Sequence, residues 1–383
     1  MIIALVSQAS VLSESWLGLS IVLVLFCLIA VFRGVRLDLF IIAFIGFWIL
    51  INFASFLVVA TPFSFTKFFG VILRILISYL GIKIVGVDHM WFYTEKVVYT
   101  LTLISIPMFL LDLMLPSLFD SFVTYFQPLT NSIFYLKEAQ SNYWYSFVYV
   151  HTGRGDLRNS GFMWEPGAFA MVIVLFAIQR WSIDGFILNR KIFIYLLALI
   201  TTFSTAGYIS LGLLFVGFMF FSSRGYFLIL LPLVLLLLNL FYGSLGFVTS
   251  KISLYLERFE GHEYYLQEQS MRYEANRILY FFIDLERSLR YPLGYGVLED
   301  YESFNKSIKL VGVNGIGRVL YTWGWIGLTL LLRSVYLFLR NYIPTRSMLV
   351  FMLSVLVMFF SNPIENSILL YMLVVSSFVK KRI

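Results

Sequence analysis

The sequence predicts an all-α protein that crosses a membrane many times. Of its 383 residues, 60% are hydrophobic and only 13% are charged. A soluble domain carries about twice that charged fraction. Inside a bilayer every backbone polar group needs a partner within the protein, and a bundle of helices meets that need. Because no internal repeat divides the chain, we expect a single membrane domain over residues 1–383.

Apolar segments close to the bilayer-crossing length of about 20 residues define the expected spans. The sequence contains about eleven such segments. They cover residues 15–33, 37–59, 66–86, 96–115, 161–180, 190–205, 207–222, 225–244, 318–338, 346–361 and 364–380. The single cysteine, Cys27, lies in the first of them, which excludes a disulfide framework.

Two long polar segments, 116–160 and 245–315, interrupt the apolar pattern. If the spans alternate, the basic residues of the short loops all fall on one side, which the positive-inside rule makes cytoplasmic. Both long segments then form loops on the outer face. The basic residues are Arg33, Arg36, Lys83, Lys96, Arg180, Arg190, Lys191, Arg224, Arg340, Arg346 and Lys380–Arg382.

The charge distribution excludes several classes of function. The formal net charge is +7, but the basic residues lie mainly at the ends of the expected helices, which argues against nucleic-acid binding. The long loops carry both signs of charge, so their arginines are expected to form defined pairs with carboxylates or with a phosphate ligand. Three scattered histidines do not have metal-ligand spacing. We therefore expect no metal site and no cofactor.

The most informative local sequence lies where the first long loop meets the span at 161–180. Pro166 is tolerated in the first turn of a helix, so a helix should begin here. Helix N-termini attract anions, and a diphosphate could lie there beside Arg158. Glu165 could then accept a proton from an incoming hydroxyl. The alternative is structural, with Glu165 stabilising the helix dipole and Arg158 capping an interfacial loop.

The second long loop contains a helical stretch, Ser250–Leu289, of the kind that lies on a membrane surface. Arg277 and Arg290 in and after this stretch are expected to face the same cavity as Arg158. The turn Pro292–Gly296 follows, and its glycines allow a close backbone approach. The alternative is that the two arginines pair with acidic residues three or four positions away, namely Glu274, Asp284 or Glu286.

Three further polar residues are weaker candidates, each for contact with a glycan. Asn314 precedes the span at 318–338 and either caps that helix or binds a sugar hydroxyl. Arg154 lies in the first long loop. Arg74 lies well inside the span at 66–86, where an arginine indicates function unless it extends to the membrane surface.

Together these stretches resemble the O-antigen polymerase and O-antigen ligase superfamily. The family's Arg-x-x-Gly-x-x-x-Glu-Pro stretch is matched from Arg158 to Pro166, with Gly161 and Glu165 in register. A second family pattern places an aromatic residue four positions after an arginine and then a Pro-Leu-x-Gly-type turn. Its counterparts here are Arg277, Phe281 and Pro292–Gly296.

A third family pattern is a His-Asn pair with a glycine ten residues after the asparagine. Asn314 and Gly324 keep this spacing, but Val313 replaces the histidine. That histidine is implicated in catalysis in the ligases, so its replacement favours the polymerase branch. The resemblance covers residues 158–327, and the first 110 residues match by hydropathy alone.

The resemblance implies a GT-C-like fold and a metal-independent glycosyltransferase in the bacterial inner membrane, with its active site facing the periplasm. Donor and acceptor would be undecaprenyl-diphosphate-linked oligosaccharides. A hydroxyl of one repeat unit would attack the donor's anomeric carbon, with Glu165 as base and Arg158, Arg277 and Arg290 holding the diphosphate. Membrane lipid and a chain-length regulator protein are further expected partners.

Three alternatives remain open, of which a structural scaffold without chemistry is disfavoured by the clustering of arginine and glutamate residues. An O-antigen ligase would pass finished glycan to a lipid A core, and Val313 counts against it. A transporter or flippase of lipid-linked oligosaccharide would usually have repeated halves and ionisable groups near the midplane. The sequence has no visible repeat, and Arg74 is the one deep candidate.

Overall fold

The chain is a mostly helical, membrane-embedded protein. The computed structural model describes residues 16–59, 64–134, 144–145, 148–151, 158–219, 277–297, 314–362, 364 and 367–379. Within these ranges five helices are long and apolar enough to cross a membrane: Leu39–Leu57, Phe65–Val85, Val87–Met114, Pro166–Ile183 and Gly315–Arg340. This bears out the expectation of an all-α membrane protein.

The elements follow the expected order. The helices are α3 (Trp16–Phe32), α4 (Leu39–Val59), α5 (Phe65–Val85), α6 (Val87–Met114), α7 (Pro116–Phe134), α8 (Pro166–Ile183), α9 (Arg190–Thr201), α10 (Thr205–Met219), α14 (Arg277–Arg290), α15 (Gly315–Arg340), α16 (Met348–Ser361) and α17 (Ile368–Ser376). A helix lies at every expected span except 225–244, which falls outside the described residues. The total of about eleven spans and the GT-C-like arrangement stay predictions.

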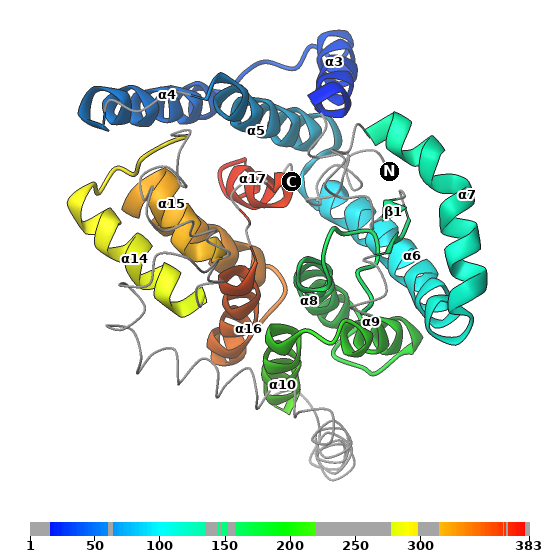
Figure 1. Cartoon of the computed structure of the whole chain (residues 1–383). Helices are drawn as coiled ribbons and strands as arrows, with labels where there is room; N and C mark the ends of the chain where they lie inside the picture. The colour runs from blue at the N-terminus through cyan, green and yellow to red at the C-terminus, as the bar shows by residue number, and fades with distance from the viewer. Residues whose placement is uncertain are drawn as a thin grey trace, which may run out of the picture.

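The helices in the middle of the bundle are apolar on all sides. In Figure 1, α17 lies at the centre, and its residues from Ile368 to Val375 are all buried. Helix α8 is buried along most of its length, from Ala168 to Ile178. A helix that is hydrophobic all round is one that other helices surround. In contrast, α4 exposes large side chains such as Phe53 and Leu57, as expected for a surface that faces lipid.

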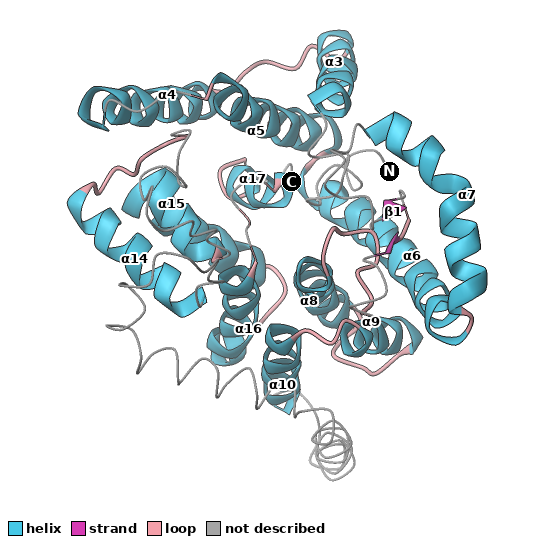
Figure 2. Ribbon diagram, viewed as in Figure 1, coloured by secondary structure: helices cyan, strands magenta, loops and turns pink. Residues whose placement is uncertain are grey.

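The first long loop contains structure that the hydropathy pattern did not predict. Helix α7 occupies residues Pro116–Phe134, and a short antiparallel hairpin of β1 (Trp144–Tyr145) and β2 (Val150–His151) follows it. Figure 2 shows this hairpin beside α6 and α7. Another difference concerns α6, which begins at Val87 and not near residue 96 as expected. Arg277–Arg290 is the described part of the helix expected at Ser250–Leu289.

Several helices begin at one end of the bundle, around Asn362. A Cβ atom added to Gly167, in the first turn of α8, would lie 2.6 Å from Asn362 Oδ1. A Cβ added to Gly315, the first residue of α15, would overlap the carbonyl oxygen of Asn362. Helix α17 begins at Ile368, a few residues after Asn362. We call this the Asn362 end of the bundle.

Candidate functional site

A fully buried asparagine holds the segment that leads into α8. Asn159 Nδ2 donates to the Thr201 hydroxyl at 2.9 Å and to Ser105 Oγ at 3.3 Å. Its Oδ1 accepts the backbone N–H of Gly161 at 2.9 Å. Gly161 has a φ of +52°, and a Cβ there would lie 2.5 Å from the ring of Phe169. This conformation therefore requires glycine, and the segment is fixed against α6 and α9.

Arg158 and Glu165 flank the start of α8. Glu165 is the N-cap residue with an extended backbone (φ −147°, ψ 154°), and Pro166 is the first helical residue, as predicted from the sequence. Both flanking side chains are half-buried. The Glu165 side chain makes no capping hydrogen bond to the helix. Its carboxylate therefore does not cap α8, whereas the side chain of Asn314 does cap α15.

Asn362 joins the starts of α8 and α15. The residue is fully buried, and its Nδ2 donates to the carbonyl of Met358 at 2.8 Å. Its Oδ1 has no hydrogen-bond partner among the described residues and lies against Gly167. Glycine at 167 and 315 lets the two helix starts approach Asn362 closely. Their N-terminal partial positive charges therefore lie near one point.

Asn314 is held by α15 itself. Its side chain accepts the backbone N–H of Gly317 at 2.7 Å, so it is the N-cap of α15 and is fully buried. The capping role, one of the two alternatives from the sequence, is the one observed. A Cβ on Gly317 would lie 2.7 Å from Asp284 Oδ2, so the start of α15 also meets the buried face of α14.

The turn after α14 fills a break in α15. Gly324 has non-helical backbone angles (φ 63°, ψ −161°) within α15. Tyr295 N–H donates to the Tyr321 carbonyl at 2.7 Å, and Trp325 N–H donates to the Pro292 carbonyl at 3.0 Å. A Cβ on Gly294 would lie 2.5 Å from Gly324 N, so neither glycine tolerates a larger residue. The turn therefore satisfies backbone groups that the break would leave unpaired inside a membrane.

Helix α4 holds the other side of the same turn. Ser55 Oγ donates to the Gly294 carbonyl at 3.0 Å, and Asn52 Oδ1 accepts the N–H of Val297 at 2.8 Å. Gly296 has a φ of +64°, and a Cβ there would lie 2.4 Å from Asn52 Oδ1. The predicted close backbone approach at Pro292–Gly296 is thus confirmed, with α4 and α15 as the neighbours.

Arg74 is buried, with 7% of its surface exposed, in α5, a helix that packs against α17. Ser78 lies four residues later and therefore on the same face. Its hydroxyl donates to the carbonyl of Ile368, the first residue of α17, at 3.4 Å. Arg74 consequently lies about 6 Å along α5 from the residue that contacts the start of α17.

Of the remaining predicted residues, Arg290, Arg277 and Arg154, the structure describes only the side chain of Arg290. Arg290 is 70% exposed and forms a 2.6 Å ion pair with Glu286, the pairing offered as its structural alternative. Arg277 is the first residue of α14, and its side chain lies outside what the structure describes. Arg154 also lies outside the described residues. The structure thus brings the segments of Arg158, Glu165, Asn314 and Arg74 to one end and leaves Arg290 on a solvent-exposed helix face.

A buried His-Asp pair near this end was not predicted from the sequence. His151 Nδ1 lies 2.9 Å from Asp112 Oδ2, and both residues are 5% exposed. Burial, followed by the nearby Asp112 carboxylate, raises the pKa of Tyr149 well above its ordinary value. Val150 N–H donates to the Gly161 carbonyl at 2.6 Å, which ties this hairpin to the α8 start. Asp112 and His151 are 39 residues apart in the sequence, so their spacing does not predict that they are in contact.

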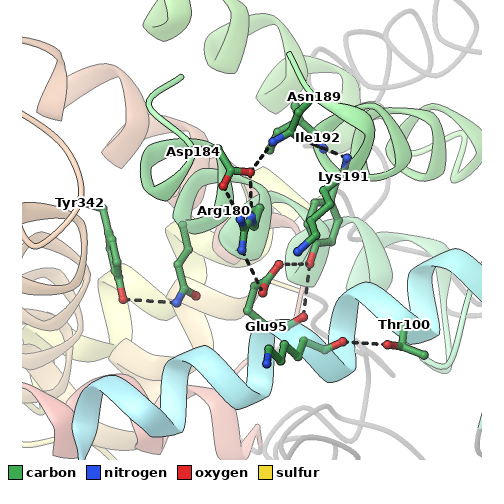
Figure 3. A network of polar contacts seen from close by, with 11 residues as sticks. Glu95, Thr100, Arg180, Asp184, Asn189, Lys191, Ile192 and Tyr342 are labelled. Atoms are coloured by element: carbon green, nitrogen blue, oxygen red, sulfur yellow. Dashed lines mark hydrogen bonds and ion pairs between the residues drawn. The ribbon is translucent and has the colours of Figure 1, made fainter. Parts of the chain in front are cut away.

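A second polar network lies at the other end of α8, about 20 Å from Gly167 along the helix. Figure 3 shows Arg180 between Asp184 and Glu95. Arg180 Nε donates to Asp184 Oδ2 at 2.8 Å, and its Nη1 lies 4.0 Å from Glu95 Oε2. The Tyr195 hydroxyl donates to Glu95 Oε1 at 3.3 Å. We call this the Arg180 end.

Outside the membrane-spanning helices, the pKa values of Asp184 and Tyr342 at the Arg180 end are shifted. Burial alone would raise the pKa of Asp184, but hydrogen bonds from Arg180 and Asn189 bring it below its ordinary value. Burial, with a contribution from Asp88, raises the pKa of Tyr342 to about 12. Tyr342 accepts a hydrogen bond from Gln179 Nε2 at 3.3 Å and stays protonated at neutral pH.

Comparisons of the chain with models of known protein families, with curated proteins and with solved structures find no match. Within the part of the chain that the structure describes, no three His, Cys, Asp or Glu side chains gather to hold a metal ion. The functional conclusion therefore depends on the residues of the Asn362 end.

Proposed function

We propose that this protein is a polymerase of lipid-linked oligosaccharides that joins undecaprenyl-diphosphate-linked repeat units on the periplasmic face of the bacterial inner membrane. The observation that carries the proposal is the convergence of helix starts at Asn362. Arg158 and Glu165 flank one of these starts, and Arg74 lies about one turn of α5 from Ser78, which contacts another. The resemblance of residues 158–327 to the O-antigen polymerase and ligase superfamily supplies the substrate class.

The chemistry assigns one role to each charged group. The oxygen of an acceptor hydroxyl forms a bond to the donor's anomeric carbon while the bond from that carbon to the diphosphate oxygen breaks. Glu165 takes the hydroxyl proton, and undecaprenyl diphosphate leaves. Arg158 and the helix starts stabilise the charge that develops on the diphosphate, which fixed guanidinium and N–H groups can do. No metal or cofactor enters this scheme.

The other predicted residues take supporting roles. Arg277 is proposed as a second diphosphate ligand and Arg290 as a weaker one, which would have to leave Glu286 to bind. Arg74 and Arg154 are proposed to contact the glycan. Since Asn314 caps α15, we propose that its role is to fix the conformation of that helix start.

A gel-ladder assay tests the proposal. Purified protein in lipid nanodiscs is mixed with synthetic lipid-linked repeat units, and the wild type is expected to give a ladder of longer glycans. Glu165→Gln should lower turnover about 100-fold, because a positioned base contributes that much. Arg158→Ala should abolish the ladder at an equal amount of folded protein. A wild type that makes no polymer, or a fully active Glu165→Gln, would remove the corresponding part of the proposal.

A transporter of lipid-linked oligosaccharide is the second candidate, and the break in α15 favours it. Transporters bind substrate at interrupted helices near the midplane. Here, however, the backbone groups of Tyr321, Thr322 and Trp325 around Gly324 are bonded to the turn Pro292–Gly296. Movement of labelled lipid oligosaccharide across vesicles without any change in glycan length would establish transport in place of polymerisation.

A further inference from the structure

Helix α7 divides into three faces along its described side chains, residues 116–127. The first face is packed against the protein. Phe119 and Val123 are 3% and 8% exposed, and they form a small cluster with Phe109 of α6 and Tyr149 next to β2. The ring of Phe119 also lies 5.6 Å from the ring of His151. This face attaches α7 to the end of α6 and to the hairpin.

The second face of α7 is apolar and exposed. Leu118 is 62% exposed, Phe122 42%, Tyr125 79% and Phe126 36%. Their spacing of four, three and one residues places them on a single stripe of a helix. In Figure 1, α7 lies at the rim of the molecule, outside α6. Large apolar side chains that share one exposed stripe indicate an interaction surface.

The third face of α7 is polar and exposed. It carries Ser117, Ser121 and Thr124 with the half-buried Asp120 beside them. Two of the hydroxyls donate to backbone carbonyls one turn earlier: Ser121 to Ser117 at 2.9 Å and Thr124 to Asp120 at 2.8 Å. A helix with adjoining apolar and polar exposed faces suits a boundary between hydrocarbon and water.

The exposed apolar surface of α6 runs directly into the apolar stripe of α7. Helix α6 is long and apolar enough to cross a membrane. Near its end it exposes Leu110, Leu111, Leu113 and Met114, with Met114 at 73%. Leu115 follows at 49% and joins the two helices. The exposed apolar surface of α6 therefore leads through Leu115 to Leu118, the first residue of the apolar stripe of α7.

We propose that α7 lies in the headgroup region of the bilayer at the Asn362 end, with Leu118, Phe122, Tyr125 and Phe126 inserted into lipid. We place α7 at this end because α6, which leads into it, is bonded there. Asn159, just before the α8 start, donates a hydrogen bond to Ser105 of α6. Because α7 contains no Lys or Arg, insertion depends on apolar contact and not on anionic lipid. The bilayer then holds Phe119, and through it the hairpin of His151, against the α8 start. This inference does not depend on the proposed function.

Spin labels on single-cysteine variants test the proposal in the full chain. In a Cys27→Ser background, cysteines replace Leu118, Phe122 and Tyr125 on the apolar stripe. Matched controls replace Ser117, Ser121 and Thr124 on the polar face. The labelled proteins are reconstituted in phosphatidylcholine vesicles, with and without phosphatidylglycerol. Collision rates with oxygen, which concentrates in lipid, and with a water-soluble nickel chelate are then measured.

The stripe labels should show an oxygen-to-nickel collision ratio several-fold higher than the control labels, in both vesicle compositions. Equal nickel access at all six positions would place α7 in water and overturn the proposal. Stripe labels shielded from both reagents would show that protein, either a partner or another segment of this chain, covers the stripe. A pattern that appears only with phosphatidylglycerol would also overturn it, because the insertion would then depend on charge.

Discussion

The two ends of α8 use polar groups in opposite ways. At the Arg180 end, acidic and basic side chains bond to one another, with Arg180 between Asp184 and Glu95. At the Asn362 end, neutral amides organise the backbone. Asn159 holds the segment before α8, Asn314 caps α15, and Asn362 lies between the starts of both helices.

This difference suggests that the Arg180 end contributes to stability and the Asn362 end to binding. A buried carboxylate such as Glu95 costs free energy unless a cation accompanies it, so the Arg180 end is expected to be rigid and sensitive to loss of one partner. Helix starts held by amides keep their own positive partial charge. The Asn362 end is therefore suited to an anion, whereas the Arg180 end is suited to holding α6, α8 and α9 together.

The largest expected effect is on stability at the Arg180 end. Arg180→Leu removes the cation that lies between Glu95 and Asp184 and should destabilise the protein by roughly 3–5 kcal/mol. Arg190→Leu, which removes an exposed arginine from the same end, is the control and should change stability by less than about 0.5 kcal/mol. Thermal unfolding in detergent, followed by tryptophan fluorescence, measures both. Equal melting temperatures for the two variants would show that the network does not stabilise the bundle.

The next effect concerns packing at the Asn362 end. Gly315→Ala places a methyl group on the backbone of Asn362 and should cost roughly 1–3 kcal/mol while displacing the α15 start. Gly46→Ala in α4 meets nothing within 4 Å and should be neutral or stabilising by about 0.5 kcal/mol. Unfolding curves and glycan ladders of both variants would be compared. An active, fully stable Gly315→Ala would show that the close approach is not required.

The smallest effect depends on pH. The folded-state pKa of Asp184 is below its ordinary value, so the stability it contributes is complete above the unfolded value of about 3.9. That contribution is lost as the pH falls through the lowered value. Wild type should therefore be more stable than Asp184→Asn at pH 7, and the difference should shrink toward pH 2. A difference that stays constant, measured by melting at each pH, would mean that the charge of Asp184 is not what stabilises the helix end.

Much of the fold could be predicted because hydropathy and proline position are local signals. Pro166 predicted the first residue of α8, and capping was one of the two roles that the sequence allowed for Asn314. Helix α7 was missed because its mixture of apolar and hydroxyl residues lowers its hydropathy, although its period of 3.6 residues was present in the sequence. The i,i+4 spacing of Arg180 and Asp184 was likewise a usable signal.

The contacts between distant segments could not be predicted. Asp112 and His151 come from α6 and a loop hairpin, and Asn362 meets Gly167 and Gly315 only in the folded chain. For Arg290 the sequence allowed two outcomes, and local pairing with Glu286 is the one observed. Periodicity describes a single element, whereas such pairs depend on how elements pack.

Equilibrium binding of undecaprenyl diphosphate to the purified protein tests most directly whether the Asn362 end takes a diphosphate. We compare wild type with Arg158→Ala and with Arg333→Ala, which removes an exposed arginine from the far half of α15. A hydrogen bond to a charged group contributes about 1.5–3 kcal/mol to binding. The Arg158→Ala protein lacks this bond and should therefore bind undecaprenyl diphosphate about 10- to 100-fold more weakly than wild type. Arg333→Ala should bind like wild type. Equal affinity in all three proteins would contradict a diphosphate site at the start of α8.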